Sequence, residues 1–140
     1  MIVVDASVAA KWILVEANSD KADALYADCV ARNEPIIAPR LLPFEIANIL
    51  RQRMRRTGML LAEAQQLMDQ FQRFTITLVE PPDLYDRALS LANAHALPAA
   101  YDAHYLVLAE HYGCALWTAD QRLLGLVGGT LSYVSPISGY

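Results

Sequence analysis

The sequence predicts a single α/β domain over residues 1–140, with a mostly parallel sheet between helices in an α/β/α sandwich. Short apolar runs rich in β-branched residues alternate with longer helical patterns along the chain. These runs do not alternate with polar residues, which is typical of parallel strands buried on both faces. A length of 140 residues suits one domain, and there is no internal repeat, low-complexity tract or linker.

The first apolar run predicts a strand at Ile2–Val4. The same reasoning predicts further strands at Ile36–Ala38, Ile76–Val79, Ala115–Thr118 and Ser132–Val134. Helical patterns fill the intervals, at residues 7–14, 20–32, 42–56, 61–73, 83–95, 102–111 and 120–126. Asp20 and Asp83 stand where helix N-caps are expected, the second of them directly after two prolines.

The composition excludes several classes of protein. Hydrophobic residues make up 55% of the chain and charged residues 19%, which supports a packed core and excludes disorder. No apolar run reaches the roughly 18 residues of a membrane span, and the N-terminus lacks the basic segment of a signal peptide. Cys29 and Cys114 have neither the spacing of a metal motif nor a disulfide framework, so we expect free thiols in a reducing cytoplasm.

Four acids stand where the predicted fold could gather them. Asp5 ends the first predicted strand, and Asp120 lies two residues beyond the fourth. The carboxyl ends of parallel strands meet at one edge of the sheet, which is where open α/β sheets bind ligands. Glu45 lies beside the core-packing stripe of the apolar helical stretch 42–50. Asp102 lies at the start of the apolar helical stretch 101–109 and could point toward that edge.

Each of these acids also has a purely structural explanation. Asp5 and Asp120 could cap the helices that follow them, Asp102 could be favoured by a helix dipole, and Glu45 could be a half-exposed acid in a first turn. The set is more informative than its members, because like charges in a pocket of low dielectric repel unless a cation joins them. Carboxylates suit Mg²⁺ or Mn²⁺, which can activate water for in-line attack on a phosphodiester.

The residues around these acids resemble the PIN-domain nucleases and, within them, the VapC-type toxins of toxin–antitoxin pairs. The resemblance runs nearly end to end and is carried by four blocks in the family's order: Val3–Val8, Pro43–Leu50, Tyr101–Ala109 and Trp117–Asp120. By this resemblance, the four acids match the family's acidic quartet, with catalytic and metal-binding roles. The most direct metal ligands would be Asp5 and Asp102.

The resemblance also implies properties of the whole protein. It implies a parallel sheet sandwiched by helices and endonucleolytic cleavage of RNA that depends on Mg²⁺ or Mn²⁺. It further implies a homodimer and a cognate antitoxin that lies across the active-site groove. Ser7 and Thr118 resemble the family's hydroxyls beside the acids and could orient a carboxylate or a water, as could Asn48; capping or local backbone bonding is the alternative for all three.

The net charge of −4 has the wrong sign for gripping nucleic acid by charge alone. Positive charge must then come from bound metal or from a local patch. The densest basic cluster is Arg51, Arg53, Arg55 and Arg56, which could hold phosphates or simply form a solvated helix end. Arg51 and Arg55 of this cluster are candidate RNA contacts. Lys11, near Asp5 in the sequence, and Arg40, shortly before Glu45, are two further candidates.

Three other functions compete with a toxin nuclease. One is a PIN nuclease of RNA processing, and another is a non-catalytic binding module, against which the intact quartet weighs. The third is an aspartyl-nucleophile phosphotransferase with Asp5 as the nucleophile. That class usually has a second acid two residues on, where this chain has Ser7, and a downstream lysine, whereas no lysine follows Lys21.

Overall fold

The computed structural model describes residues 1–140, and at its centre is a five-stranded sheet in the order β3-β2-β1-β4-β5. All neighbouring strands are parallel, so the expected architecture is confirmed. The strands are β1 (Ile2–Val4), β2 (Ile36–Pro39), β3 (Thr77–Val79), β4 (Leu116–Thr118) and β5 (Val134–Pro136). β5 begins two residues later than expected and ends on a proline, which an edge strand tolerates because its outer side needs no N–H donor.

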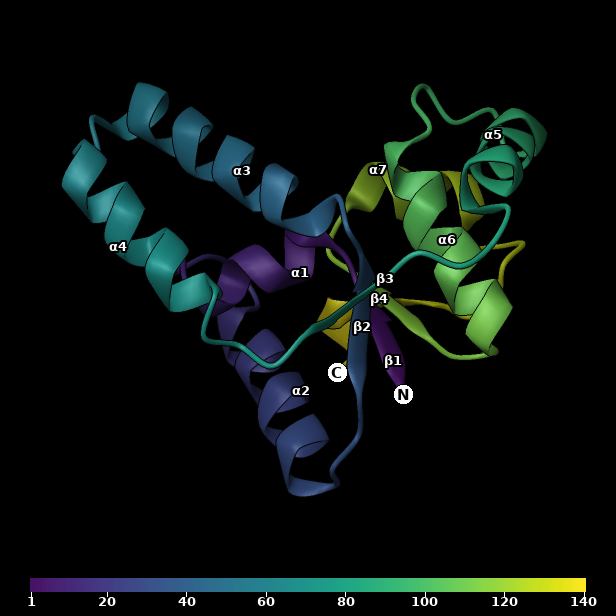
Figure 1. Ribbon diagram of the computed structural model, residues 1–140, viewed down its shortest axis with the longest axis horizontal. Coiled ribbons are helices and arrows are strands. Elements are labelled where there is room, and N and C mark those ends of the chain that lie inside the picture. The colour runs from purple at the N-terminus through teal and green to yellow at the C-terminus, as the bar shows by residue number, and fades with distance from the viewer.

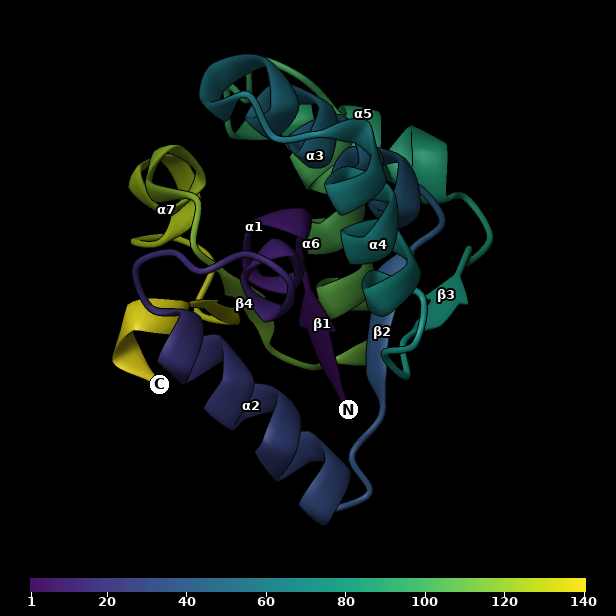
Figure 2. The same cartoon turned by 90° about the vertical axis from the view of Figure 1, so that its left-hand side faces the viewer.

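Helices cover both faces of this sheet (Figures 1 and 2). On one face α6 (Tyr101–Tyr112) packs against β1, β2 and β4, and α5 (Leu84–Ala94) packs against α6. On the other face lie α1 (Ala6–Ala9), a 3₁₀ turn at Ala10–Trp12, and α2 (Ser19–Ala31). The helices α3 (Leu42–Thr57) and α4 (Leu61–Phe71) form an arm that extends from the sheet. The short α7 (Gln121–Val127) contacts β5, and a 3₁₀ turn at Ile137–Gly139 follows β5.

All seven predicted helices are present, but some of their details differ. The helix expected at residues 7–14 is a short α-helix followed by a 3₁₀ turn. Asp20 is not an N-cap, because α2 begins one residue earlier and places Asp20 in its first turn. Asp83 does occupy the N-cap position of α5, but its left-handed backbone (φ 60°) leaves the side chain without a capping hydrogen bond.

One strand differs from its expected environment. β3 was expected to be buried on both faces, yet Thr77 and Leu78 are exposed. The reason is its place at the edge of the sheet, where the helices that cover the central strands no longer reach both faces. The central strands β1 and β2 are buried throughout, as the sequence predicts.

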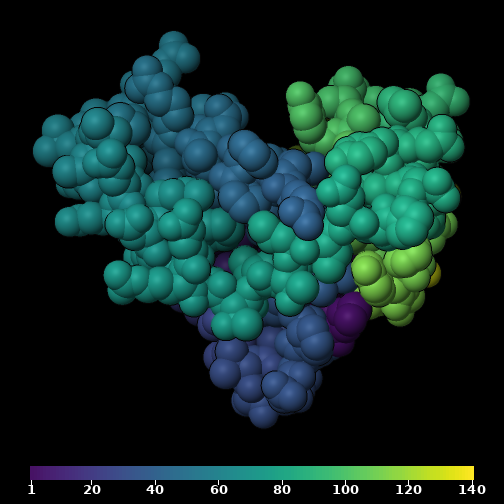
Figure 3. Space-filling model, viewed as in Figure 1, coloured from purple at the N-terminus to yellow at the C-terminus, as the bar shows by residue number.

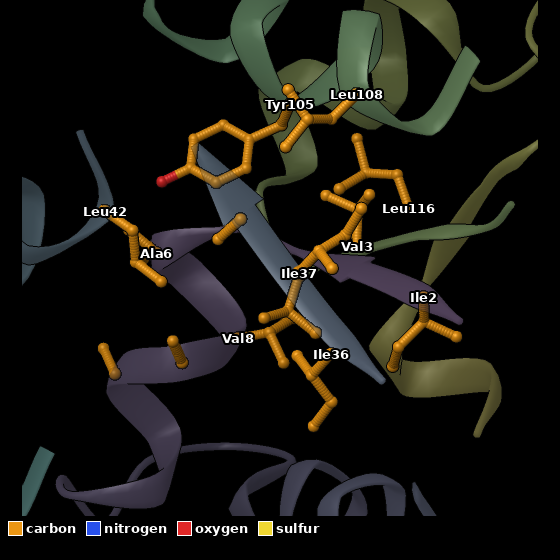
Figure 4. Packing of buried hydrophobic residues seen from close by; sticks show 14 of the residues in the cluster. Ile2, Val3, Ala6, Val8, Ile36, Ile37, Leu42, Tyr105, Leu108 and Leu116 are labelled. Atoms are coloured by element: carbon orange, nitrogen blue, oxygen red, sulfur yellow. The ribbon is translucent and has the colours of Figure 1, made fainter. Parts of the chain in front are cut away.

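The core is densest between α6 and the sheet. Figure 4 shows Tyr105 and Leu108 of α6 close to Val3 and Leu116, side chains of the two adjacent strands β1 and β4. These residues expose at most 1% of their surface. Such packing fixes α6, and with it the acid at its beginning, relative to the carboxyl ends of the strands.

Two further expectations concern cysteines and membranes. Cys29 is buried and Cys114 half-buried, and both are free thiols, as expected. None of the helices combines the length and the apolar character that a membrane span requires.

We expect the substitution Leu108→Ala to lower the free energy of unfolding by about 2–5 kcal/mol, because it removes a fully buried side chain and leaves a cavity. Urea denaturation followed by circular dichroism measures this. Leu89→Ala is the matched control, since Leu89 of α5 is 65% exposed and its loss should change stability by less than about 0.5 kcal/mol. Equal effects of the two substitutions would contradict the described packing.

Candidate active site at the carboxyl edge of the sheet

Asp5 is a buried carboxylate at the junction of β1 and α1. It follows the last residue of β1 and exposes only 4% of its surface. Its Oδ1 accepts hydrogen bonds from the Val8 amide (3.0 Å), which makes Asp5 the N-cap of α1, and from the Ser7 hydroxyl (2.6 Å). Thr118, at the end of β4, donates its hydroxyl to Oδ2. Burial raises the pKa of Asp5 to about 6, although these hydrogen bonds favour the charged form.

Two hydroxyl groups join the ends of β1 and β4 around this carboxylate. Ser7 Oγ accepts the Ala119 amide at 2.7 Å, and Thr118 Oγ1 accepts the Asp120 amide at 3.0 Å. Each hydroxyl therefore receives a backbone hydrogen bond from the loop after β4 and donates its proton to Asp5. This network fixes the orientation of the carboxylate and the path of the chain that leads to Asp120.

Glu45 approaches from the first turn of α3. Its Oε1 accepts a hydrogen bond of 2.7 Å from the hydroxyl of Tyr105, a residue of α6 that is 1% exposed. Figure 4 shows the Tyr105 hydroxyl turned toward the side on which α3 lies. Burial raises the pKa of Glu45 to about 7, with smaller contributions from the negative charges of Asp102 and Asp5. Burial also raises the pKa of Tyr105 well above its ordinary value, so its hydroxyl remains a donor.

Asp102 and Asp120 are more accessible and share one arginine. Asp102 lies in the first turn of α6, and Asp120 is the N-cap of α7, where its Oδ1 accepts the amides of Arg122 (2.8 Å) and Leu123 (3.1 Å). The Arg122 guanidinium lies 3.8 Å from Asp102 Oδ2 and 3.9 Å from Asp120 Oδ2. Burial and the neighbouring Asp120 raise the pKa of Asp102, while Arg122 lowers it.

The four acids form one electrostatic group with Asp102 at its centre. The charge of Asp102 raises the pKa of both Asp5 and Glu45, and the charge of Asp120 raises that of Asp102. The fold thus brings together carboxylates that are far apart in the sequence, at the edge where the parallel strands end. Excess negative potential of this kind favours the binding of a cation.

The oxygens of the four carboxylates do not converge on one point. No group of three or more acidic, histidine or cysteine side chains is arranged closely enough to hold a metal ion. The hydrogen bonds explain why, because Ser7 and Thr118 engage Asp5, Tyr105 engages Glu45, and Arg122 lies between the other two acids. The donor set, which is entirely carboxylate oxygen, fits Mg²⁺ or Mn²⁺, and side-chain rotation would have to complete the coordination.

The structural placements considered for the four acids are all confirmed. Asp5 and Asp120 both cap helices through one carboxylate oxygen. Capping does not exclude a second role, because the other oxygen of Asp120 points toward Arg122 rather than to an amide. Asp102 and Glu45 lie in first turns without capping a helix.

The predicted supporting residues differ in their placement. Ser7 and Thr118 contact Asp5 directly, whereas Asn48 is exposed on α3, one turn beyond Glu45. Two residues that contact the acids, Tyr105 and Arg122, were not predicted from the sequence. The signal for Tyr105 was a polar atom in an apolar helix three residues after Asp102. For Arg122 the signal was a cation two residues after the possible cap Asp120.

The candidate RNA contacts are also spread over different environments. Lys11 is paired with Glu16 at 3.2 Å and its side chain is only 9% exposed, so a phosphate would have to displace Glu16 to reach it. Arg40 is exposed and pairs with Glu80 at 3.3 Å. Arg51 and Arg55 are exposed on α3, where Arg51 is turned about 120° from the face of Glu45 and Arg55 about 80°.

The relatives that comparison with known proteins finds are named as VapC ribonucleases. The chain is 36% identical to the VapC ribonuclease Mb0985 of Mycobacterium bovis over 123 residues, which are 88% of each chain. It is equally similar to the ribonuclease VapC9 of Mycobacterium tuberculosis, and 29% identical to the ribonuclease VapC3 of Pyrobaculum aerophilum over 87% of this chain and 91% of that one.

The fold itself has a solved counterpart. The crystal structure of PAE2754 from Pyrobaculum aerophilum superposes with a TM-score of 0.72, covering 99% of this chain and 90% of that one at 23% identity. The family model of the PIN domain matches residues 2–127, a range that contains all four acids. The chain therefore belongs to the PIN domain family.

Proposed function

We propose that this protein is a metal-dependent endoribonuclease that acts as the toxin of a toxin–antitoxin pair. The observation that carries the proposal is the group of four electrostatically linked carboxylates at the carboxyl edge of the sheet: Asp5, Glu45, Asp102 and Asp120. The relatives named VapC ribonucleases support RNA as the substrate. Their similarity over nearly the whole chain supports the same role for this protein.

The residues have distinct roles in this proposal. Asp5 and Asp102 are the most direct ligands of a divalent ion, and Glu45 and Asp120 complete the site directly or through water. Ser7 and Thr118 hold the Asp5 carboxylate in one orientation, and Tyr105 does the same for Glu45. A bound Mg²⁺ or Mn²⁺ supplies activation of a water molecule and stabilisation of the charge that develops on the phosphodiester.

Arg122 has a place in the same scheme. In the metal-free site its guanidinium compensates the charges of Asp102 and Asp120. Its side chain is 64% exposed, so it can move toward an incoming phosphate when a bound cation compensates these charges instead. Arg40 and Arg55 are exposed cations that could hold more distant phosphates, while Arg51 faces away from Glu45.

The partners follow from the family resemblance and remain proposals. We expect a homodimer, a cytoplasmic location, and a cognate antitoxin that covers the active-site groove. Leu60 and Leu61, at the tip of the arm formed by α3 and α4, are 67% and 60% exposed. Two adjacent leucines in water support a protein contact at this arm, because exposed apolar patches often mark interaction sites.

Cleavage of RNA should require both a divalent ion and the acids. We expect wild-type protein to cut single-stranded RNA in Mg²⁺ or Mn²⁺, and EDTA or Asp5→Asn to lower the rate by about 100-fold or more. Gel analysis of end-labelled RNA measures this. Asp86→Asn, which changes an exposed acid of α5, should leave the rate unchanged. Undiminished cleavage in EDTA would refute the metal mechanism.

The metal-free protein should become more stable as the pH falls from 7.5 to 5.5. The pKa of Asp5 is about 6 in the folded protein and 3.8 ordinarily, so in this range the folded state binds more protons than the unfolded state. Between these two pH values the stability gained on acidification is about 0.8 kcal/mol for this group. Thermal unfolding in EDTA measures it, and Asp5→Asn should make the pH dependence shallower, leaving the contribution of Glu45, whose pKa is raised to about 7.

The stabilisation of the protein by divalent ions should increase as the pH rises. Mg²⁺ or Mn²⁺ should raise the melting temperature more at pH 7.5 than at pH 5.5, because protons compete with the ion for the same carboxylates. Stabilisation of equal size at both values would show that the ion binds elsewhere.

A toxin should arrest growth through the same site. Induced expression of the wild-type chain in a bacterial host should stop growth, whereas Asp5→Asn and Asp102→Asn should not, at equal protein levels measured by immunoblot. Asp86→Asn should remain toxic. Normal growth with the active wild-type enzyme would instead favour a PIN nuclease of RNA processing.

A further inference from the structure

A hollow of about 660 Å³ adjoins the acidic site between α3 and the beginning of α6. Figure 3 shows the surface cut by a notch between the arm of α3 and α4 and the chain around residue 100. Glu45 lines this hollow, so the hollow adjoins the acidic site at one of its four carboxylates. A polymer bound at the carboxylates would therefore pass through this hollow or beside it.

Two aromatic rings flank the hollow and lie open to solvent. Phe44 is 77% exposed and Tyr101 is 66% exposed. Each ring directly precedes an acid of the site, Glu45 in one case and Asp102 in the other. Because these rings are mostly exposed, core packing does not explain why each stands directly before an acid of the site.

The other residues of the hollow define what can bind there. Asn48 and Gln52 extend exposed amide groups along the face of α3 that carries Glu45. Apart from Glu45, no lining residue carries a charge. A phosphate would be repelled by this carboxylate and would find no cation, whereas a neutral, planar group with polar edges fits both the rings and the amides.

We propose that this hollow binds one unpaired nucleobase of a single-stranded RNA next to the bond that is cut. Phe44 and Tyr101 stack on the base, and the amides of Asn48 and Gln52 meet its edge. Aromatic stacking of splayed bases is how proteins commonly recognise single-stranded RNA. This inference rests on the proposed function, because it names a subsite of the same RNA.

Binding of RNA that contains the fluorescent base 2-aminopurine tests the proposal. Short single-stranded oligonucleotides carry this base at each position in turn and are titrated in Mg²⁺ with the protein carrying Asp5→Asn, which prevents cleavage. One position should show quenched fluorescence on binding, because the base stacks on a ring. Phe44→Ala and Tyr101→Ala should each weaken binding about tenfold and remove the quenching.

Conservative variants separate stacking from apolar contact. Phe44→Tyr and Tyr101→Phe keep a ring and should bind RNA within about twofold of the parent. Phe44→Leu keeps apolar area without a ring and should behave like Phe44→Ala; full binding by this variant would overturn the stacking proposal. Tyr112→Ala is the matched control, since Tyr112 is an exposed tyrosine at the opposite end of α6.

The outcomes distinguish this proposal from the proposed function. If the ring variants bind RNA as well as the Asp5→Asn parent, and cut it as well as the wild type when Asp5 is restored, the base subsite is wrong and the nuclease assignment stands. If the wild-type chain neither binds nor cuts RNA, both are wrong. Circular dichroism and the melting temperature should be unchanged in every variant, because these rings are mostly exposed.

Discussion

The burial of negative charge at one edge of the sheet is the constraint on which the rest of this structure depends. Asp5 is held almost completely out of water, close enough to Asp102 and Glu45 for their negative charges to interact. Burying an ionised carboxylate is costly unless hydrogen bonds or a cation compensate it. The hydroxyls of Ser7 and Thr118 supply part of that compensation, and the raised pKa of Asp5 indicates that they do not supply all of it.

The parallel sheet explains how such distant residues meet. β1 and β4 are neighbours and run in the same direction, so the residues after them, Asp5 and Asp120, emerge at the same edge. The helices that contribute the other two acids come from different parts of the fold. α6 lies on one face of the sheet, and α3 begins directly after β2 and contacts α1 on the other. The Tyr105–Glu45 hydrogen bond joins these two helices across the site.

Much of this arrangement could be predicted from the sequence. The buried strand before Asp5 and the apolar helix after Asp102 carry clear patterns, because burial on two faces requires continuous apolar runs. Turns and caps were harder to predict: Asn18, with a left-handed backbone, occupies the N-cap position of α2 in place of the predicted Asp20. The exposure of β3 depends on strand order, which no local pattern encodes.

The site shows the same division between local and long-range information. The acids could be found because they follow strand ends or begin helices, and because of the family resemblance. The partners of those acids could not, since the bonds from Thr118 to Asp5 and from Tyr105 to Glu45 span 113 and 60 residues. The separation of the carboxylate oxygens likewise follows from these partners and not from the acids' own positions.

The most direct measurement is the number of protons released when Mn²⁺ binds, obtained by titration calorimetry at pH 6.5 in buffers with different ionisation enthalpies. The pKa of Asp5 is about 6 and that of Glu45 about 7, so both carboxyls are partly protonated there and must lose protons to an entering ion. We predict one saturable site and a release of about one proton. Binding without proton release, or no binding, would contradict the account.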